Sequence, residues 1–144
     1  MRVIIINGPN LNLLGTRETN IYGNDSFESF FKVLENTNNH LVKLEYYQSN
    51  VEGEIINKIH EIAFEKGEKY DGIIINAGGY THTSVAIADA IAGIDIKTIE
   101  VHISNIFARE EYRHVSLLAK NCIGSISGFG LKSYELALSY FLKP

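Results

Sequence analysis

A glutamate and a histidine, Glu100 and His102, stand two positions apart near the end of an apolar segment. Residues two apart in a strand point to the same side of a sheet, so the sequence predicts that these side chains lie together. A carboxylate beside an imidazole fixes its tautomer and ring orientation, which a general acid or base needs. The same pattern is also typical of a core histidine that is satisfied by a neighbouring acid.

A tyrosine and an arginine, Tyr22 and Arg17, lie five positions apart in a polar, glycine-containing segment. A free tyrosine has a pKa of about 10 and is a poor base at neutral pH. A nearby guanidinium favours the phenolate and would make Tyr22 useful as a base. The alternative is a surface tyrosine that packs on the arginine stem. If Tyr22 is a base, His102 supplies the opposite role of proton donor.

Two further groups offer hydrogen bonds to a substrate. Asn10 and Asn12 are uncharged partners for a substrate or a water, although asparagine is also common in turns. Ile103 and Ser104 follow the Glu100–His102 pair, and their backbone N–H groups at a strand end suit an anion such as a carboxylate.

Short apolar segments alternate with helical patterns along the chain. Strands are expected at residues 3–7, 41–48, 72–76, 97–103 and 121–127, and the β-branched runs at 3–6 and 73–75 predict strands covered on both faces. The segment 41–47 alternates, as a strand nearer the edge does. Helices are expected to begin near Ser26, Glu52, Thr83 or Ser84, and Leu131.

This alternation predicts an α/β fold with a parallel sheet and right-handed crossovers. Ligands of such sheets bind beyond the carboxyl ends of the strands. Asn10 and Asn12 follow the first strand, Asn76 and His82 follow the third, and Arg113 lies beyond the fourth, so the unusual polar residues gather at one end of one sheet.

Length and composition set the class of protein. The 144 residues are expected to form a single domain, and 45% hydrophobic with 21% charged residues is ordinary for a globular protein. The net charge of −4 and scattered basic residues argue against nucleic-acid binding. Without a signal-like segment or a membrane-spanning stretch, a cytoplasmic location is the default expectation. The single cysteine, Cys122, is interpreted as a small core residue.

The sequence motifs of several common kinds of site are absent. There is no phosphate-binding P-loop, no dinucleotide-binding glycine motif after the first strand, and the five histidines lack metal-ligand spacings. The sequence therefore predicts an acid–base site with no metal and no cofactor.

Five separated motifs, in order along nearly the whole chain, resemble the type II 3-dehydroquinate dehydratases. They are Asn7-Gly8-Pro9-Asn10-Leu11-Asn12-Leu13-Leu14-Gly15 with Arg17 and Tyr22-Gly23; Gln48-Ser49-Asn50 with Glu52-Gly53; Asn76 and Gly78; Tyr80-Thr81-His82-Thr83-Ser84-Val85-Ala86-Ile87 with Asp89; and Glu100-Val101-His102-Ile103-Ser104-Asn105 with Arg109-Glu110 and Arg113-His114. The resemblance implies a flavodoxin-like three-layer sandwich with a five-stranded parallel sheet. It also implies dehydration of 3-dehydroquinate to 3-dehydroshikimate in the shikimate or quinate pathway.

The resemblance further assigns roles in this reaction. Tyr22 would remove a proton beside the ketone, Arg17 would keep Tyr22 ionised, and an enolate would form with Asn12 helping through a bound water. His102, oriented by Glu100, would protonate the departing hydroxyl in a trans elimination. The substrate contacts that the family implies come from Asn76, His82 and Arg113, with the carboxylate at Ile103 and Ser104. Asn10 is predicted as a further substrate-binding residue.

The resemblance also implies a homo-oligomer, a dodecamer built from trimers, in which Asp89 reaches a neighbouring subunit's site. Asp89 stands in an otherwise apolar helical stretch, where a carboxylate needs a reason, although a solvated position on an amphipathic helix is the alternative.

Two other functions compete with the dehydratase. A flavodoxin-like module that binds FMN would give a yellow protein. A structural or scaffolding protein of the same fold would leave the one-ended cluster of polar residues unexplained.

Overall fold

Five strands form one parallel sheet in the computed structural model, which describes residues 1–16 and 26–143. The strand order is β2-β1-β3-β4-β5, with each neighbouring pair parallel. The strands are β1 (Arg2–Asn7), β2 (Lys43–Gln48), β3 (Gly72–Asn76), β4 (Thr98–His102) and β5 (Gly124–Ser127). Each of the five strands predicted from the sequence is confirmed.

Two predicted strands begin later than expected, because backbone turns occupy their first residues. Val42 N donates to Asn38 O at 3.0 Å and closes the preceding helix, while Cys122 N donates to Ala119 O at 3.1 Å and closes a short 3-10 turn. Val42 and Cys122 still pack against the two cores, although Leu41 and Ile123 are exposed, so the apolar pattern alone did not separate turn from strand.

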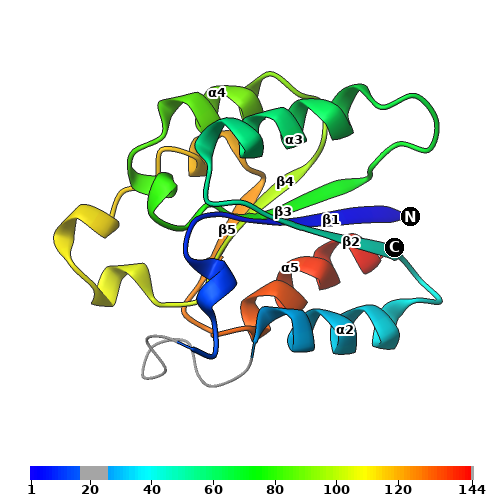
Figure 1. Ribbon diagram of the computed structural model, residues 1–144, viewed down its shortest axis with the longest axis horizontal. Coiled ribbons are helices and arrows are strands. Elements are labelled where there is room, and N and C mark those ends of the chain that lie inside the picture. Colours follow the sequence, from blue (N-terminus) through cyan, green and yellow to red (C-terminus); the bar gives the residue numbers. More distant parts are fainter. Residues whose placement is uncertain (17–25, 144) are drawn as a thin grey trace.

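In the described residues, four α-helices cover the sheet, two on each face. They are α2 (Phe27–Asn38), α3 (Glu52–Phe64), α4 (Val85–Ala92) and α5 (Lys132–Leu142). Helices α3 and α4 lie on one face and α2 and α5 on the other (Figure 1). This is the α/β fold with a parallel sheet that the alternating pattern predicts, and the flavodoxin-like three-layer sandwich that the resemblance implies.

Local sequence explains where two helices begin. The Ser26 hydroxyl accepts from Ser29 N at 3.2 Å, and the Ser84 hydroxyl accepts from Ile87 N at 2.9 Å. Serine side chains at this position satisfy backbone donors that a first helical turn leaves free. Of the two alternatives for α4, the structure therefore selects Ser84.

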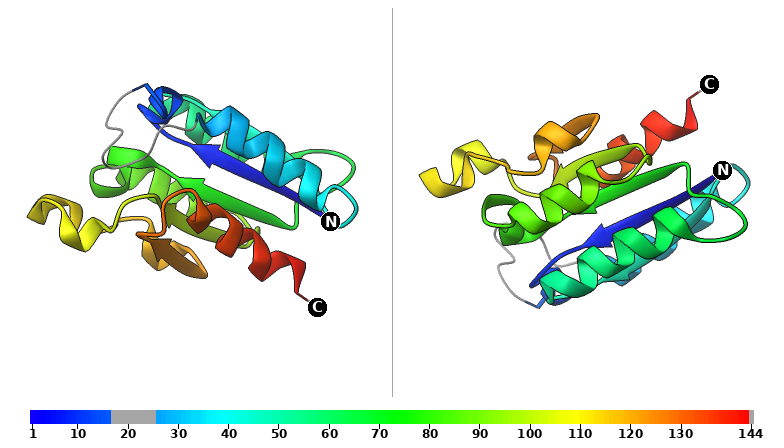
Figure 2. Two further views of the ribbon diagram at one scale, coloured as in Figure 1. Left: turned by 90° about the horizontal axis from the view of Figure 1, so that it is seen from below. Right: turned by 90° about the horizontal axis from the view of Figure 1, so that it is seen from above.

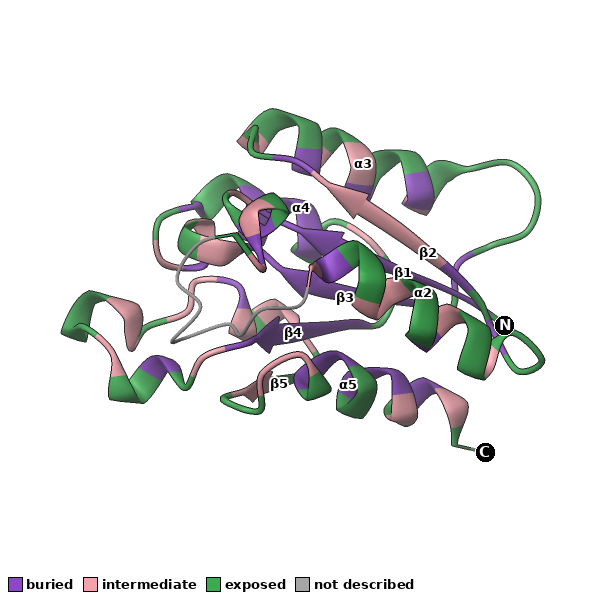
Figure 3. Cartoon of the chain, turned by 60° about the horizontal axis from the view of Figure 1, so that its bottom comes forward, coloured by how far each residue is buried: buried purple, intermediate pink, exposed green. Residues whose placement is uncertain are grey.

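The central strands β1, β3 and β4 are buried throughout, as Figure 3 shows, whereas β2 and β5 form the partly exposed edges. One apolar core lies between the sheet and α2 and α5, and the other lies between the sheet and α3 and α4. No described helix is both long and apolar enough to cross a membrane.

The connection from β4 to β5 differs from the other crossovers, because it holds three short 3-10 helices. These are η3 (Ile106–Ala108), η4 (Glu111–Arg113) and η5 (Ala119–Asn121). The part with η3 and η4, yellow in Figure 2, extends beyond the carboxyl ends of the strands. Two more 3-10 helices, η1 (Leu11–Leu13) and η2 (Gly78–His82), follow β1 and β3 at the same edge.

Candidate active site

The carboxyl ends of β1 and β3 approach closely and form the floor of the candidate site. Gly8 N donates to Asn76 O at 2.7 Å. A Cβ atom at Gly8 would lie 2.4 Å from the backbone oxygen of Ala77, so only glycine fits there. Two residues on, Asn10 adopts a left-handed φ of 68°, which asparagine tolerates better than most residues. Asn10 therefore forms a turn, which was one of the two readings of this residue, and η1 begins directly after it.

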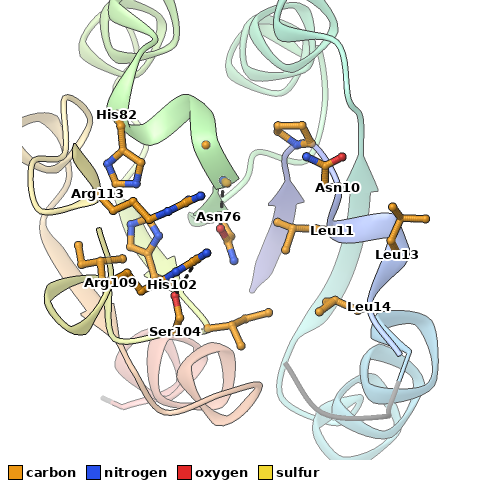
Figure 4. A pocket seen from close by; sticks show the side chains of 15 residues that line it. Asn10, Leu11, Leu13, Leu14, Asn76, His82, His102, Ser104, Arg109 and Arg113 are labelled. Atoms are coloured by element: carbon orange, nitrogen blue, oxygen red, sulfur yellow. Dashed lines mark hydrogen bonds between the residues drawn. The ribbon is translucent and has the colours of Figure 1, made fainter. Parts of the chain in front are cut away.

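A cavity of about 170 Å³ opens at this edge. Figure 4 shows His82, Arg113, Arg109, His102, Ser104 and Asn76 on one side and the η1 segment on the other. Leu11 and Leu14 are buried side chains of that second wall. The cavity thus has a polar wall, from β3, β4 and the long crossover, and a more apolar wall from the turn after β1.

The amide of Asn76 is held in one orientation. Its Oδ1 accepts from Gly78 N at 3.1 Å, and its Nδ2 donates to the Tyr134 hydroxyl at 2.8 Å. That hydroxyl in turn donates to Oδ1 of Asn7 at 2.8 Å. Asn7, Asn76 and Tyr134 are all buried, so the network fixes a polar group of the cavity from below.

His102 and Glu100 lie together at the end of β4, as the two-residue spacing predicted. Nε2 of His102 is 3.0 Å from Oε1 of Glu100, and the exposed fractions of the two residues are 5% and 0%. Nε2 does not meet the geometry of a hydrogen bond to a described residue, so this contact is electrostatic and becomes an ion pair when the imidazole is protonated. His102 lines the cavity, and Glu100 lies behind it.

Glu100 is ionised despite its burial. Burial by itself would raise the pKa of this carboxyl, but the nearby imidazole of His102 and hydrogen bonds from Ser116 and Thr81 outweigh that effect and lower the pKa. The carboxylate can therefore stabilise a positive charge on His102 and hold the ring.

His82 stacks beside His102, with ring centroids 6.3 Å apart and an angle of 18° between the planes. Its Nδ1 lies 2.8 Å from the backbone oxygen of Val115. A carbonyl only accepts, so Nδ1 carries the hydrogen. In neutral His82 the other nitrogen, Nε2, is consequently an acceptor.

The charged groups that line the cavity are basic. Arg109 donates to the Ser104 hydroxyl at 3.4 Å, and Arg113 Nε donates to Glu110 Oε2 at 2.8 Å. No carboxylate lines the cavity among the residues that the structure describes. This field favours an anionic ligand.

The sequence-predicted site residues fall into four groups. Seven line the cavity: Asn10, Asn76, His82, His102, Ile103, Ser104 and Arg113. Glu100 supports the cavity from behind, through His102. Asn12 is exposed on η1 and Asp89 is exposed on α4, and neither lines the cavity. Arg17 and Tyr22 lie outside the described residues.

Four residues around these groups were not predicted as part of the site. Thr81, Ser116 and Ser125 donate hydrogen bonds to Glu100, and Tyr134 holds Asn76. The sheet register offered one signal, because Ser125 on β5 pairs with Glu100 on β4. Ser116 and Tyr134 carry no local signal, since their partners are 16 and 58 residues away.

Together, the fold and the cavity define a flavodoxin-like α/β enzyme with a buried glutamate–histidine pair beside a wall that carries basic side chains. The chain belongs to the dehydroquinase class II family, whose sequence model matches residues 1–142. It is 59% identical over 143 residues to a protein of Caldicellulosiruptor bescii named 3-dehydroquinate dehydratase, covering 99% of this chain and 96% of the relative. A protein of the same name from Fusobacterium nucleatum is 53% identical over 146 residues, covering 99% of this chain and 97% of the relative.

A solved structure also resembles the chain closely. The crystal structure of type II dehydroquinase from Butyrivibrio crossotus matches with a TM-score of 0.93 and 48% identity, covering 99% of this chain and 98% of that one.

Proposed function

We propose that this protein is a 3-dehydroquinate dehydratase, a hydro-lyase that removes water from 3-dehydroquinate to form 3-dehydroshikimate. Membership of the class II dehydroquinase family supports the reaction. The structural observation that carries the proposal is the buried Glu100–His102 pair, which meets a cavity whose charged lining is basic. The substrate is a carboxylate that loses a hydroxyl group, so it needs both an anion site and a proton donor.

The elimination proceeds in two steps in this proposal. Tyr22, kept as phenolate by Arg17, removes a proton from the carbon beside the ketone, and the electron pair forms an enolate. Asn12 assists the enolate through a bound water. The enolate then collapses and expels the hydroxyl group, which takes a proton from His102 and leaves as water from the opposite face. Glu100 stabilises the imidazolium that supplies this proton.

The cavity residues hold the substrate. Its carboxylate accepts from the backbone N–H groups of Ile103 and Ser104 at the end of β4. Asn76, His82 and Arg113 contact its ring hydroxyl groups, and Asn10 closes the opposite wall. Support for this arrangement comes from the fixed amide of Asn76 and the fixed ring of His82, because each presents a defined group to the cavity.

The proposed working form is a homo-oligomer, a dodecamer of trimers, in which Asp89 serves a neighbouring subunit's site. Asp89 is exposed on α4 and does not line the cavity of its own chain, which is compatible with a role across a subunit boundary. We place the reaction in the shikimate pathway of aromatic amino acid biosynthesis, in the cytoplasm, with neither metal nor cofactor.

The test is to add 3-dehydroquinate to the purified protein and follow the ultraviolet absorbance of the conjugated enone product. The expected result is steady product formation by a colourless protein, unchanged by a metal chelator. A protein that forms no enone contradicts the proposed function, and a yellow protein that releases FMN on denaturation would favour the flavin-binding alternative. Loss of turnover with the chelator would contradict a metal-free reaction.

A further inference from the structure

Glu100 accepts hydrogen bonds from hydroxyl groups in three separate parts of the chain. Ser116, in the long crossover, donates to Oε1 at 2.7 Å, and Thr81, in η2, donates to the same oxygen at 3.1 Å. Ser125, on β5, donates to Oε2 at 3.2 Å. Glu100 and Thr81 are each 0% exposed, so the hydrogen bond between them lies away from solvent.

The proton of Ser116 has one possible destination among the described residues. Its oxygen already accepts from Leu118 N at 3.1 Å and from Ala119 N at 3.0 Å. A hydroxyl has one donor and two acceptor positions, so these two bonds fill its acceptor capacity. Ser116 can therefore only donate towards Glu100, and a proton on Oε1 would leave the two groups donor against donor.

This geometry disfavours a proton on Oε1 of Glu100. A protonated Oε1 would lose its bond with Ser116 and face the hydroxyl proton. Oε2 is the other place for a proton, and there Ser125 can reverse its role and accept. Ser116 can therefore only donate to the carboxyl group of Glu100, whereas Ser125 can either donate to it or accept from it.

Few titratable groups surround this carboxylate. His102 contacts it from its own strand, and His82 stacks on the far side of that ring. Cys122, in the segment before β5, feels its charge: burial, and then the charge of Glu100, raise the pKa of this thiol to about 12. Cys122 is thus neutral in the working range of pH. Arg109 and Arg113 line the cavity beyond His102, where Glu110 pairs with Arg113.

We propose that Ser116 and Thr81 are positioning residues that act on His102 through Glu100. The proton of Ser116 is committed to the carboxylate, and both hydroxyl groups donate to Oε1. Their hydrogen bonds stabilise the ionised carboxylate and thereby keep the proton of the Glu100–His102 pair on the imidazole. This inference rests on the proposed function, in which His102 donates that proton to the departing hydroxyl group. Without the two donors, the proton moves to Glu100 and leaves a neutral imidazole, which is a weaker acid.

Infrared titration of the protein tests the inference without using activity. A buried protonated carboxyl gives a C=O stretching band, and Glu100→Gln identifies which band belongs to Glu100. We expect Ser116→Ala to raise the midpoint of this band by about one pH unit or more. Thr81→Val, which removes a hydroxyl but keeps the side-chain shape, shifts it in the same direction. Ser125→Ala shifts it less, because that serine also serves the protonated form.

Ser49 provides a matched control. Its hydroxyl accepts from Val51 N at 2.9 Å and donates to the carboxylate of Glu54, away from the cavity. Ser49→Ala therefore also removes a hydroxyl that accepts from a nearby backbone N–H and donates to a carboxylate. The midpoint of the Glu100 band should keep its wild-type value in this variant. The inference is overturned if the band in Ser116→Ala and Thr81→Val keeps the midpoint of the unchanged protein while circular dichroism reports folded chains.

The pH dependence of turnover gives a second readout. Ser116→Ala should lower kcat about tenfold with little change in KM, and should move the acidic limb of the kcat profile to higher pH. Ser116→Thr restores both, because threonine supplies the same hydroxyl. A purely structural role predicts lower stability with an unshifted limb, which also overturns the inference. Absence of turnover in the unchanged protein would reject the proposed function instead, and the infrared result would still be readable.

Discussion

The hydroxyl of Tyr134 accepts a hydrogen bond from the amide of Asn76 at 2.8 Å, although 58 residues separate them in the chain. Tyr134 comes from the first turns of α5, which packs on the opposite side of the sheet from α3 and α4. Helix α5 carries no residue that lines the cavity, yet its Tyr134 fixes the orientation of Asn76, which does line the cavity.

Tyr134→Phe should weaken substrate binding and turnover. The change removes one oxygen and leaves buried polar atoms of Asn76 and Asn7 without their partner, which costs about 1–3 kcal/mol of stability. We expect a several-fold loss in kcat/KM, measured with 3-dehydroquinate, and a lower midpoint in urea. Tyr140→Phe is the control, because Tyr140 lies on the same helix with 52% of its surface exposed. Equal kinetics for the two variants would contradict the positioning of Asn76 by Tyr134.

Tyr22→Phe should fold normally and lose nearly all turnover. Only the phenolic oxygen is removed, and loss of a positioned base typically lowers the rate by about two to four orders of magnitude. The measurement is kcat by enone absorbance, with Tyr140→Phe as a control at an exposed tyrosine. Turnover close to that of the unchanged protein would reject Tyr22 as the base.

The amino-terminal edge of the sheet should show a pH-dependent stability that is independent of the active site. Glu45 accepts from Arg2 Nε and from the Tyr70 hydroxyl, both at 2.7 Å. The bond from Arg2 chiefly lowers the pKa of Glu45, from 4.5 to about 2, against the opposing effect of burial. A lowered folded-state pKa contributes stability above pH 4.5, and this contribution is lost as the pH falls towards about 2.

Glu45→Gln should therefore lower the free energy of unfolding by about 2 kcal/mol at neutral pH, because Arg2 loses its charged partner. The difference from the unchanged protein should shrink as the pH falls below about 4.5. Urea unfolding at a series of pH values measures it. The control Glu61→Gln removes an exposed partner of Lys58 and should change stability by less than about 0.5 kcal/mol. A pH-independent difference would refute the assignment.

Mixing two inactive proteins should restore activity if Asp89 serves a neighbouring site. His102→Ala and Asp89→Ala each lack one group, and reassembled mixed oligomers contain some sites with both. Activity above either parent is the expected result, measured after subunits are dissociated and reassembled. Each protein reassembled alone is the control. If no activity returns, Asp89 acts in its own chain or not at all, and a fully active monomer in sizing experiments would count against the proposal more directly.

Local patterns in the sequence determined the elements and one central pair of the site. The runs of β-branched residues specify strands buried on both faces, Ser26 and Ser84 start their helices, and the spacing of Glu100 and His102 puts both on one side of β4. These features depend on periodicity and on contacts within a few residues. Because parallel strands end at one edge, the gathering of Asn76, His82 and His102 also followed from the sequence.

Tertiary structure alone decided which groups support that pair. Ser116 reaches Glu100 across 16 residues of irregular chain, and Tyr134 reaches Asn7 across 127 residues. A serine or a tyrosine has no periodic signature, and its partner depends on how the long crossover folds and how α5 docks on the sheet. Local backbone N–H groups of Leu118 and Ala119 fill the acceptor positions of Ser116, but only tertiary packing places the Glu100 carboxylate where the remaining hydroxyl proton can reach it.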